Sequence, residues 1–307
     1  MIHLLIGTIL LRPYVFVFLA AFLFISIVNY GLRTTILFAM ITVLLANLCE
    51  WSSIHNGFPF GLYHYYDTTR TREIWINGVP LMDSLSFTFL AFASYTVALL
   101  ANAPLYRNGL DLRLLDTARL RRSLRVWFMA ALFMVMIDLV VDPLSVLGNR
   151  WFLGKLFWYD PPGPYFGVPI NNYLGWFFIA AVAVGLFQVL DTWLSRSGAK
   201  PIGVLPQLPA RALMGPLLYA GIVTFGITML FVIGADEIGW ASIFIFVPFL
   251  VLLLSIVTRP SSYGDLAAVS RHLADFPYDA PFLYTPDDSA APRRPRAVSL
   301  NAGRFKR

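Results

Sequence analysis

Long apolar segments separated by short polar ones dominate the chain. An apolar stretch at residues 2–11 is interrupted by Arg12 and Pro13, and seven longer apolar stretches follow. Each is close to the ~20 residues that an α-helix needs to cross a bilayer core. Because that core holds no water, the backbone of a crossing segment must bond to itself, which favours helices. The pattern predicts transmembrane helices over about residues 14–31, 34–51, 79–102, 126–147, 169–194, 212–234 and 238–258.

The composition indicates the same class of protein. Hydrophobic residues make up 58% of the 307 residues, charged residues only 13%, and the mean hydropathy is +0.69. These values exclude an ordinary soluble domain and indicate an all-α, polytopic membrane helix bundle. We assign residues 1–258 to this membrane domain, which would carry the catalytic site. Residues 259–307, rich in Pro, Ser and Arg, are expected to form a mostly disordered tail.

The distribution of basic residues predicts how the bundle is oriented. With seven crossings, 18 of the 23 lysines and arginines lie on the side that carries the C-terminal tail. The positive-inside rule therefore places the N-terminus outside and the tail in the cytoplasm, as a multi-pass protein of the cell (inner) membrane. Because these basic residues flank apolar segments, the net charge of +6 indicates contact with anionic membrane lipid rather than with nucleic acid.

Two polar segments, which we call the motif loops, interrupt the apolar pattern in similar ways. The first runs from Glu50 to Asp83, and the second runs from Asp138 to Trp176. Each begins with a carboxylate near the end of an apolar segment. Each returns to apolar sequence through Gly-Val-Pro-(Leu/Ile), at residues 78–81 and 167–170. The predicted topology puts both loops on the outer face, so we expect them to form one composite site.

Residue types exclude two familiar kinds of membrane chemistry. A retinal Schiff base needs a lysine inside the last helix, but the three lysines, at positions 155, 200 and 306, all lie outside the apolar segments. A di-iron hydroxylase needs many histidines at helical spacing, and the four histidines, at positions 3, 55, 64 and 272, form no such cluster. We therefore expect no metal site. No nucleotide or flavin motif indicates a cofactor.

Carboxylates at membrane depth are the strongest candidates for catalysis. Ionisable groups are costly inside a membrane span and commonly serve a function there. A carboxylic acid in apolar surroundings can stay protonated and act as a general acid. Structural roles remain open for two of the candidates, since Asp83 could cap a helix and Asp142 precedes a proline that favours a turn. Asp138 and Asp142 lie at i and i+4, on one face of a helix. The candidate catalytic residues are Glu50, Asp83, Asp138 and Asp142.

The motif loops also supply candidates for binding a substrate. Their aromatic residues either form a belt at the membrane interface or line a pocket in which ring faces stabilise a cation. His55 suits a hydrogen bond in the loop better than a metal ion. Asn171 and Asn172 could cap the fifth helix or hold a water molecule. The candidate substrate-binding residues are Tyr63, Tyr65, Tyr165, Asn171, Trp176 and His55.

Taken in order, the two motif loops resemble a known family. The first reads Glu50…Gly-x-x-x-Gly-x-Tyr-x-Tyr, ending at Tyr65, followed by Gly-Val-Pro-Leu. The second reads Asp138-x-x-x-Asp-Pro…Tyr-Phe-Gly-Val-Pro-x-Asn-x-Tyr-x-Gly-Trp, ending at Trp176. Both are similar to the membrane-integral carotenoid hydratases of the CruF (bisanhydrobacterioruberin hydratase) type, over roughly residues 35–260. The resemblance implies a cofactor-independent hydro-lyase that adds water across the terminal C1–C2 double bond of an acyclic carotenoid such as lycopene.

The residue types in the motif loops agree with that chemistry. Hydration of such an alkene starts with protonation, which gives a tertiary carbocation that water then captures. The reaction needs a dry acid, an aromatic wall and one placed water molecule. A carotenoid end-group cyclase starts with the same protonation and stays an alternative, although no Pro-x-Glu-Glu signature is present. A proton-coupled transporter or a lipid-binding membrane protein could use the same carboxylates as a relay.

Overall fold

The computed structural model describes residues 2–196, 205 and 207–283, and within them seven helices are long and apolar enough to cross a membrane. This confirms the predicted all-α bundle, and the bounds differ from expectation by a few residues. The largest difference is at the end of α3, which continues to Asn56 and ends at Gly57 in the left-handed conformation that glycine favours. The seven are α2 (Pro13–Tyr30), α3 (Leu32–Asn56), α4 (Leu81–Leu100), α6 (Leu124–Val146), α7 (Ile170–Arg196), α8 (Arg211–Val232) and α9 (Asp236–Thr258).

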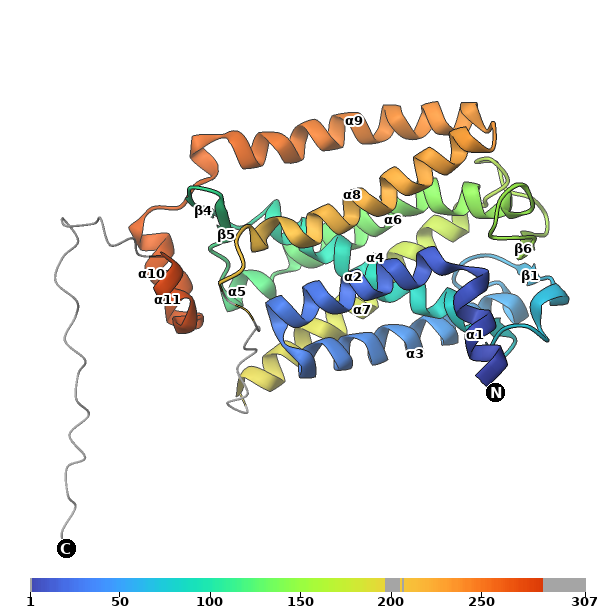
Figure 1. The fold of residues 1–307 in the computed structure, drawn as a ribbon, viewed down its shortest axis with the longest axis horizontal. Coiled ribbons are helices and arrows are strands. Elements are labelled where there is room, and N and C mark those ends of the chain that lie inside the picture. The colour runs from blue at the N-terminus through green and yellow to red at the C-terminus, as the bar shows by residue number, and fades with distance from the viewer. Residues whose placement is uncertain (1, 197–204, 206, 284–307) are drawn as a thin grey trace, which may run out of the picture.

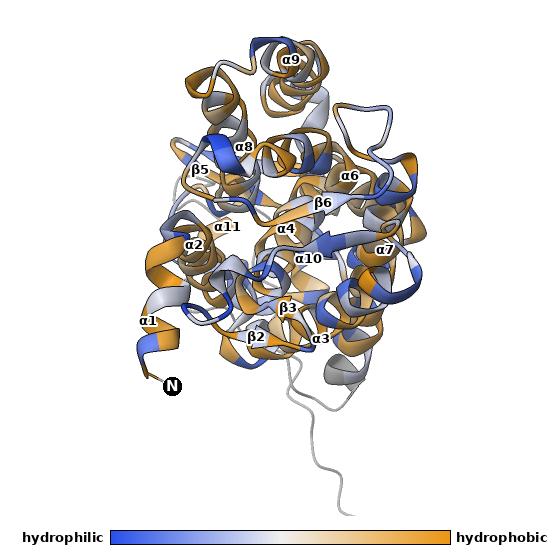
Figure 2. Cartoon of the chain, turned by 90° about the vertical axis from the view of Figure 1, so that its right-hand side faces the viewer, coloured by the Kyte–Doolittle hydropathy of each residue, from blue (hydrophilic) through white to orange (hydrophobic). Residues whose placement is uncertain are grey.

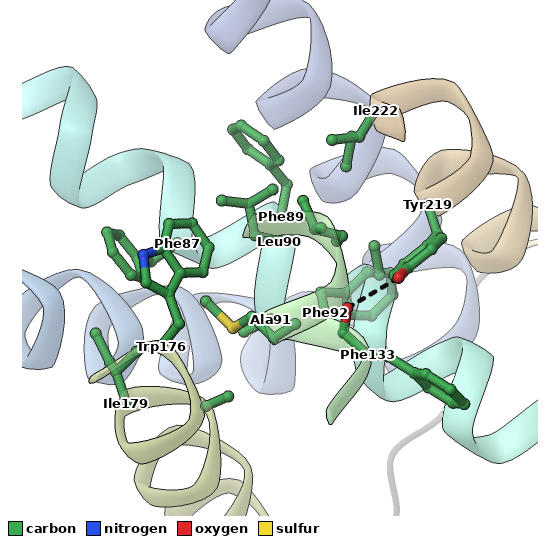
Figure 3. Packing of buried hydrophobic residues seen from close by; sticks show 14 of the residues in the cluster. Phe87, Phe89, Leu90, Ala91, Phe92, Phe133, Trp176, Ile179, Tyr219 and Ile222 are labelled. Atoms are coloured by element: carbon green, nitrogen blue, oxygen red, sulfur yellow. Dashed lines mark hydrogen bonds between the residues drawn. The ribbon is translucent and has the colours of Figure 1, made fainter. Parts of the chain in front are cut away.

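Helix α4 forms the centre of the bundle. It packs against α2, α3, α6, α7 and α8, and nearly all of its side chains are buried. Helix α9, in contrast, packs mainly on α8 and lies at the edge of the bundle (Figure 1). Around α4 the core is largely aromatic, and the Tyr219 hydroxyl donates a 2.8 Å hydrogen bond to the Phe133 carbonyl. Figure 3 labels this packing: Phe87, Phe89, Leu90, Ala91, Phe92, Phe133, Trp176, Ile179, Tyr219 and Ile222.

Short strands, which the sequence pattern did not predict, tie the loops together. In the described part of the chain they form three antiparallel pairs: β1 (Tyr63–Tyr65) with β6 (Phe157–Tyr159), β2 (Trp75–Ile76) with β3 (Val79–Pro80), and β4 (Leu105–Asn108) with β5 (Asp111–Leu114). The β1–β6 pair joins the first motif loop to the second. Both motif loops therefore lie at one end of the bundle, as Figure 1 shows. The assignment of this end to the outer face of the membrane stays a prediction.

The short helix α1 (Ile2–Leu11) packs over the first motif loop at the same end (Figure 2). The Thr8 hydroxyl accepts a 2.9 Å hydrogen bond from the Ile74 backbone N–H. Gly7 lies against the Arg72 carbonyl so closely that a Cβ atom there would come within 1.8 Å of the oxygen. Arg12, which interrupts the first apolar run, is buried in an ion pair with Glu73. The N-terminal segment is thus part of the structure that holds this loop in place.

The opposite end of the bundle carries α5 (Ala118–Arg121), α10 (Leu266–Asp275) and α11 (Ala280–Leu283). Four single 3-10 turns complete the described elements: η1 (Asp67–Thr69), η2 (Gly148–Arg150), η3 (Pro260–Ser262) and η4 (Pro277–Asp279). The expectation of a mostly disordered tail from residue 259 is wrong for residues 260–283. Asp265 caps α10 through a 2.8 Å bond from the Ala268 N–H, and α10 then buries Val269 and His272. Residues 284–307 lie outside the described residues.

His272 connects this C-terminal segment to the bundle. Its Nδ1 lies 2.7 Å from the Asp116 carbonyl oxygen, and its Nε2 lies 3.2 Å from Asp279 Oδ2. Both partners can only accept, so both ring nitrogens donate when the imidazole is protonated. Burial alone would lower the pKa of His272, but the hydrogen bond to Asp279 and the charge of Asp116 raise it above the ordinary value.

We therefore expect the C-terminal segment to detach more readily as the pH rises. A histidine with a raised pKa stabilises the folded state fully below its unfolded pKa, and the stabilisation is lost as the pH passes the folded pKa. Limited proteolysis should cut within residues 266–283 faster at alkaline than at mildly acidic pH. The His272→Gln variant, which carries no titratable charge, should lose this pH dependence. Equal cleavage of the unaltered protein at both pH values would contradict the role given to His272.

Candidate functional site

A cavity of about 110 Å³ lies among the helices at the end that carries the motif loops. Three carboxyl groups from three different helices line it: Glu50 near the end of α3, Asp83 in the first turn of α4 and Asp142 in the last turns of α6. Its volume leaves room for water beside an apolar group. Carboxyl groups, tyrosines and apolar side chains thus meet in one cavity.

Glu50 has little hydrogen-bond support in this space. Its side chain is buried, with a relative exposure of 2%. In the described part of the chain its carboxyl group receives one hydrogen bond, a 2.8 Å bond from the Ser84 hydroxyl to Oε2. The Ser84 oxygen in turn accepts from Asn47 Nδ2 at 3.3 Å. A buried carboxyl group with so few donors is suited to carrying its own proton, because ionisation would leave the charge poorly compensated.

Asp83 is held by the tyrosines of β1. The Tyr65 hydroxyl donates to Asp83 Oδ2 at 2.5 Å, and the Tyr63 hydroxyl lies 3.4 Å from that of Tyr65. Burial, reinforced by nearby carboxylates that include Asp83, raises the pKa of both tyrosines. Both phenols therefore keep their protons over the physiological range, and Tyr65 donates its proton in the hydrogen bond to Asp83.

Asp142 receives two hydrogen bonds on one oxygen. The Tyr159 hydroxyl donates to Oδ2 at 2.9 Å, and Asn172 Nδ2 donates to the same atom at 2.7 Å. Asn172 Nδ2 also donates to Asp138 Oδ2 at 2.7 Å, so its two hydrogens serve both carboxyl groups. Donors of this kind favour the carboxylate anion over the neutral acid. Glu50 and Asp142 therefore lie in contrasting surroundings within one cavity.

An aromatic wall completes the cavity. Trp176 of α7 and Phe87 of α4 both line it, with ring centroids 4.9 Å apart. The Tyr63 ring packs edge-on against Phe157 at 5.6 Å and Tyr159 at 5.8 Å. Ring faces carry negative electrostatic potential and stabilise a cation held near them. The wall can therefore support a carbocation without offering it a nucleophile.

The structure brings together six of the ten candidate site residues predicted from the sequence. The residues that line the cavity are Glu50, Asp83, Asp142, Tyr63, Tyr65 and Trp176. Asp138 lies one helical turn from Asp142, fully buried, and does not line the cavity. It contacts Asn172 instead, which makes it a candidate for positioning rather than for contact with a substrate. The predicted i,i+4 relation of Asp138 and Asp142 on one helix face agrees with this shared partner.

Three other candidates lie away from the cavity. Asn171 is exposed, and its neighbour Asn172 takes the place in the site. Tyr165 packs on Phe166 and Tyr173. His55 is exposed, 2.6 Å from the Trp51 carbonyl oxygen through Nδ1, in a separate outer pocket that it shares with His64. The assignment of Asn171, Tyr165 and His55 to the site therefore has no support in the geometry.

Several residues of the cavity were not among the predicted site residues, and Asn172 was considered only as a helix cap or as a residue that holds water. Asn172 is four residues before Trp176, so the two share one face of α7, and this spacing was a usable signal. Tyr159 reaches the site only because β6 pairs with β1, and no local sequence pattern predicts this pairing. The described residues contain no group of three or more His, Cys, Asp or Glu side chains that could hold a metal ion.

Comparison with known protein families identifies the family of this chain. The sequence matches the family model described as carotenoid biosynthesis protein over residues 3–238. The matched region begins in α1, earlier than the resemblance noted in the motif loops, and includes every residue that lines the cavity. No match was found among curated proteins or among solved structures.

Proposed function

Because this chain belongs to the carotenoid biosynthesis protein family, we propose that it is a carotenoid hydratase. In this proposal it adds water across the terminal C1–C2 double bond of an acyclic carotenoid, without a cofactor. The membrane-spanning bundle matches a substrate that dissolves only in lipid. A C40 polyene is a rod about as long as the ~30 Å hydrocarbon core, so its end group would lie near the depth of the motif loops.

The reaction is a proton transfer followed by capture of a cation. The Glu50 carboxyl group gives its proton to C2, the π electrons form the new C–H bond, and C1 becomes a tertiary carbocation. Trp176 and Phe87 offer ring faces to this cation. A water molecule bonds to C1 through oxygen and loses a proton to the Asp142 carboxylate. The proton then returns to Glu50, so that the net change is the addition of one water molecule.

One observation carries this proposal: two carboxyl groups in the cavity receive different numbers of hydrogen bonds. Glu50 receives one hydrogen bond from the described residues, whereas a single oxygen of Asp142 receives two. Acid–base catalysis of hydration needs one neutral and one ionised carboxyl group in the same space. Asp83, which receives a single hydrogen bond from Tyr65, is the second candidate for the acid. Asp138 acts through Asn172, which it holds in place for Asp142.

Analysis of the reaction product tests the proposal directly. Membranes that contain the protein should convert lycopene, or a related acyclic carotenoid, to a product heavier by the mass of one water molecule. The reaction should proceed without oxygen, and in oxygen-18 water the heavy isotope should appear in the product. A product of unchanged mass would indicate a cyclase. An oxygen-dependent gain of one oxygen atom would indicate a hydroxylase, and no product from any acyclic carotenoid would overturn the proposal.

A further inference from the structure

The cavity is too short to hold a whole carotenoid. Asp83 at its outer end and Leu90 at its deep end both lie on α4. Seven residues separate them, which is about 10 Å along a helix. A C40 polyene is about three times as long, close to the ~30 Å of the hydrocarbon core. Most of such a substrate must therefore lie outside the cavity while its end group reacts.

One side of the cavity is closed by side chains of α2 and α8. Tyr14 and Phe18 of α2 line it, and so do Ile222 and Phe225 of α8. The Tyr14 and Phe225 rings stack with centroids 5.1 Å apart, and Phe18 meets Phe225 edge-on at 5.7 Å. Tyr14, Phe18 and Phe225 are each half-buried, so they lie between the cavity and the surface of the bundle. We call these three residues the aromatic gate.

The surface outside the gate is apolar. Val17 on α2, beside Phe18, is 65% exposed, and Phe152, whose ring lies 5.5 Å from that of Tyr14, is 51% exposed, as expected for residues that face lipid chains. Helix α9 packs on α8, and Figure 2 places it on the far side of α8 from α2. The α2–α8 seam is therefore left uncovered by α9. Rotation of the aromatic side chains about their χ angles can open a passage between the two helices. The backbone hydrogen bonds of the helices need not break.

We propose that the seam between α2 and α8 is a lateral entrance for the substrate from the bilayer. The end of an acyclic polyene passes between Tyr14, Phe18 and Phe225 and reaches the carboxyl groups, while the rest of the chain stays in the seam and in lipid. The identity of the molecule that passes through this entrance, an acyclic carotenoid, rests on the proposed function. The entrance explains why a site at the end of the bundle has an apolar extension toward the middle of the membrane.

A reversible cross-link across the gate tests this entrance. Phe18→Cys and Phe225→Cys would be combined with Cys49→Ala, which removes the lone native cysteine. Joining the pair with a short bifunctional thiol reagent that contains a reducible bond should abolish both uptake of carotenoid by the purified protein and its conversion. Reduction of the linker should restore both. Phe231→Cys with Trp240→Cys is a matched control, because those rings join α8 to α9 at a similar 5.6 Å and do not line the cavity.

The possible outcomes distinguish failure of the proposed entrance from failure of the proposed hydratase activity. Loss of uptake in the linked gate pair alone, reversed by reduction, supports the entrance. Unchanged uptake in the linked gate pair, or equal loss in the linked control pair, overturns it. Uptake is measured from bound pigment and needs no chemistry. A protein that binds carotenoid through the gate but gives no hydrated product would therefore retain the entrance and refute the hydratase.

Discussion

Replacing Glu50 by glutamine is expected to slow hydration by about 10²–10⁴-fold, the usual contribution of a general acid. Glutamine has the shape of glutamate and can still accept the hydrogen bond that Ser84 donates to Oε2. It cannot release a proton to an alkene. The variant should therefore accumulate in the membrane, bind carotenoid and leave it unchanged. The measurement is the rate of product formation by membranes matched for protein content.

A control for this substitution lies at the same end of the bundle. Glu237, in the first turn of α9, is exposed and does not line the cavity. Glu237→Gln makes the same chemical change on the surface and should leave the rate unaltered. If Glu50→Gln hydrates at the rate of the unaltered protein, Glu50 is not the acid. Asp83 would then be the carboxyl group to examine, since it also lines the cavity and receives one hydrogen bond from the described residues, donated by Tyr65.

The membrane bundle could be predicted closely because its signal is local. Each spanning helix is a long run of mostly apolar residues, and Gly31 and Gly57 both flank helix ends in the structure. The tail was misjudged for the opposite reason. The tail is rich in Pro, Ser and Arg, so composition suggested disorder, but the short helix α10 within it buries one face through Val269 and His272. The spacing of apolar residues within Leu266–Asp275 indicates a helix with one buried face, which the average composition of the tail does not reveal.

The carboxyl groups of the site could be predicted from the sequence, but their hydrogen-bond partners could not. Carboxylates in spans stand out in a sequence because they are costly there, and Glu50, Asp83 and Asp142 were found on that basis. Their partners were not, because Ser84, Tyr159 and Asn172 are ordinary residues whose meaning depends on three-dimensional contacts. The difference between an acid and a base in this cavity lies in those partners. A single sequence therefore indicates that carboxyl groups act here, but not which role each one takes.

The last prediction separates the two roles by following the proton in heavy water. Asp142→Asn should lower hydration by about 10²–10⁴-fold, as expected for loss of a general base. It leaves Glu50 in place, so the alkene is still protonated at C2. With no base to activate water, the carbocation returns a proton from C2 to Glu50 and reverts to the alkene. In deuterium oxide the recovered substrate should therefore gain deuterium at C2 without gaining oxygen.

Glu50→Gln should behave differently in the same experiment, because without the acid no carbocation forms. Its recovered carotenoid should contain neither deuterium nor new oxygen. Asp236→Asn, an exposed carboxylate in the first turn of α9, serves as the matched control for Asp142→Asn and should hydrate normally. Full hydration by Asp142→Asn would remove its role as base. Absence of exchange in Asp142→Asn would mean that Asp142 is already needed for protonation, so that the acid and the base work as one unit rather than in two separable steps.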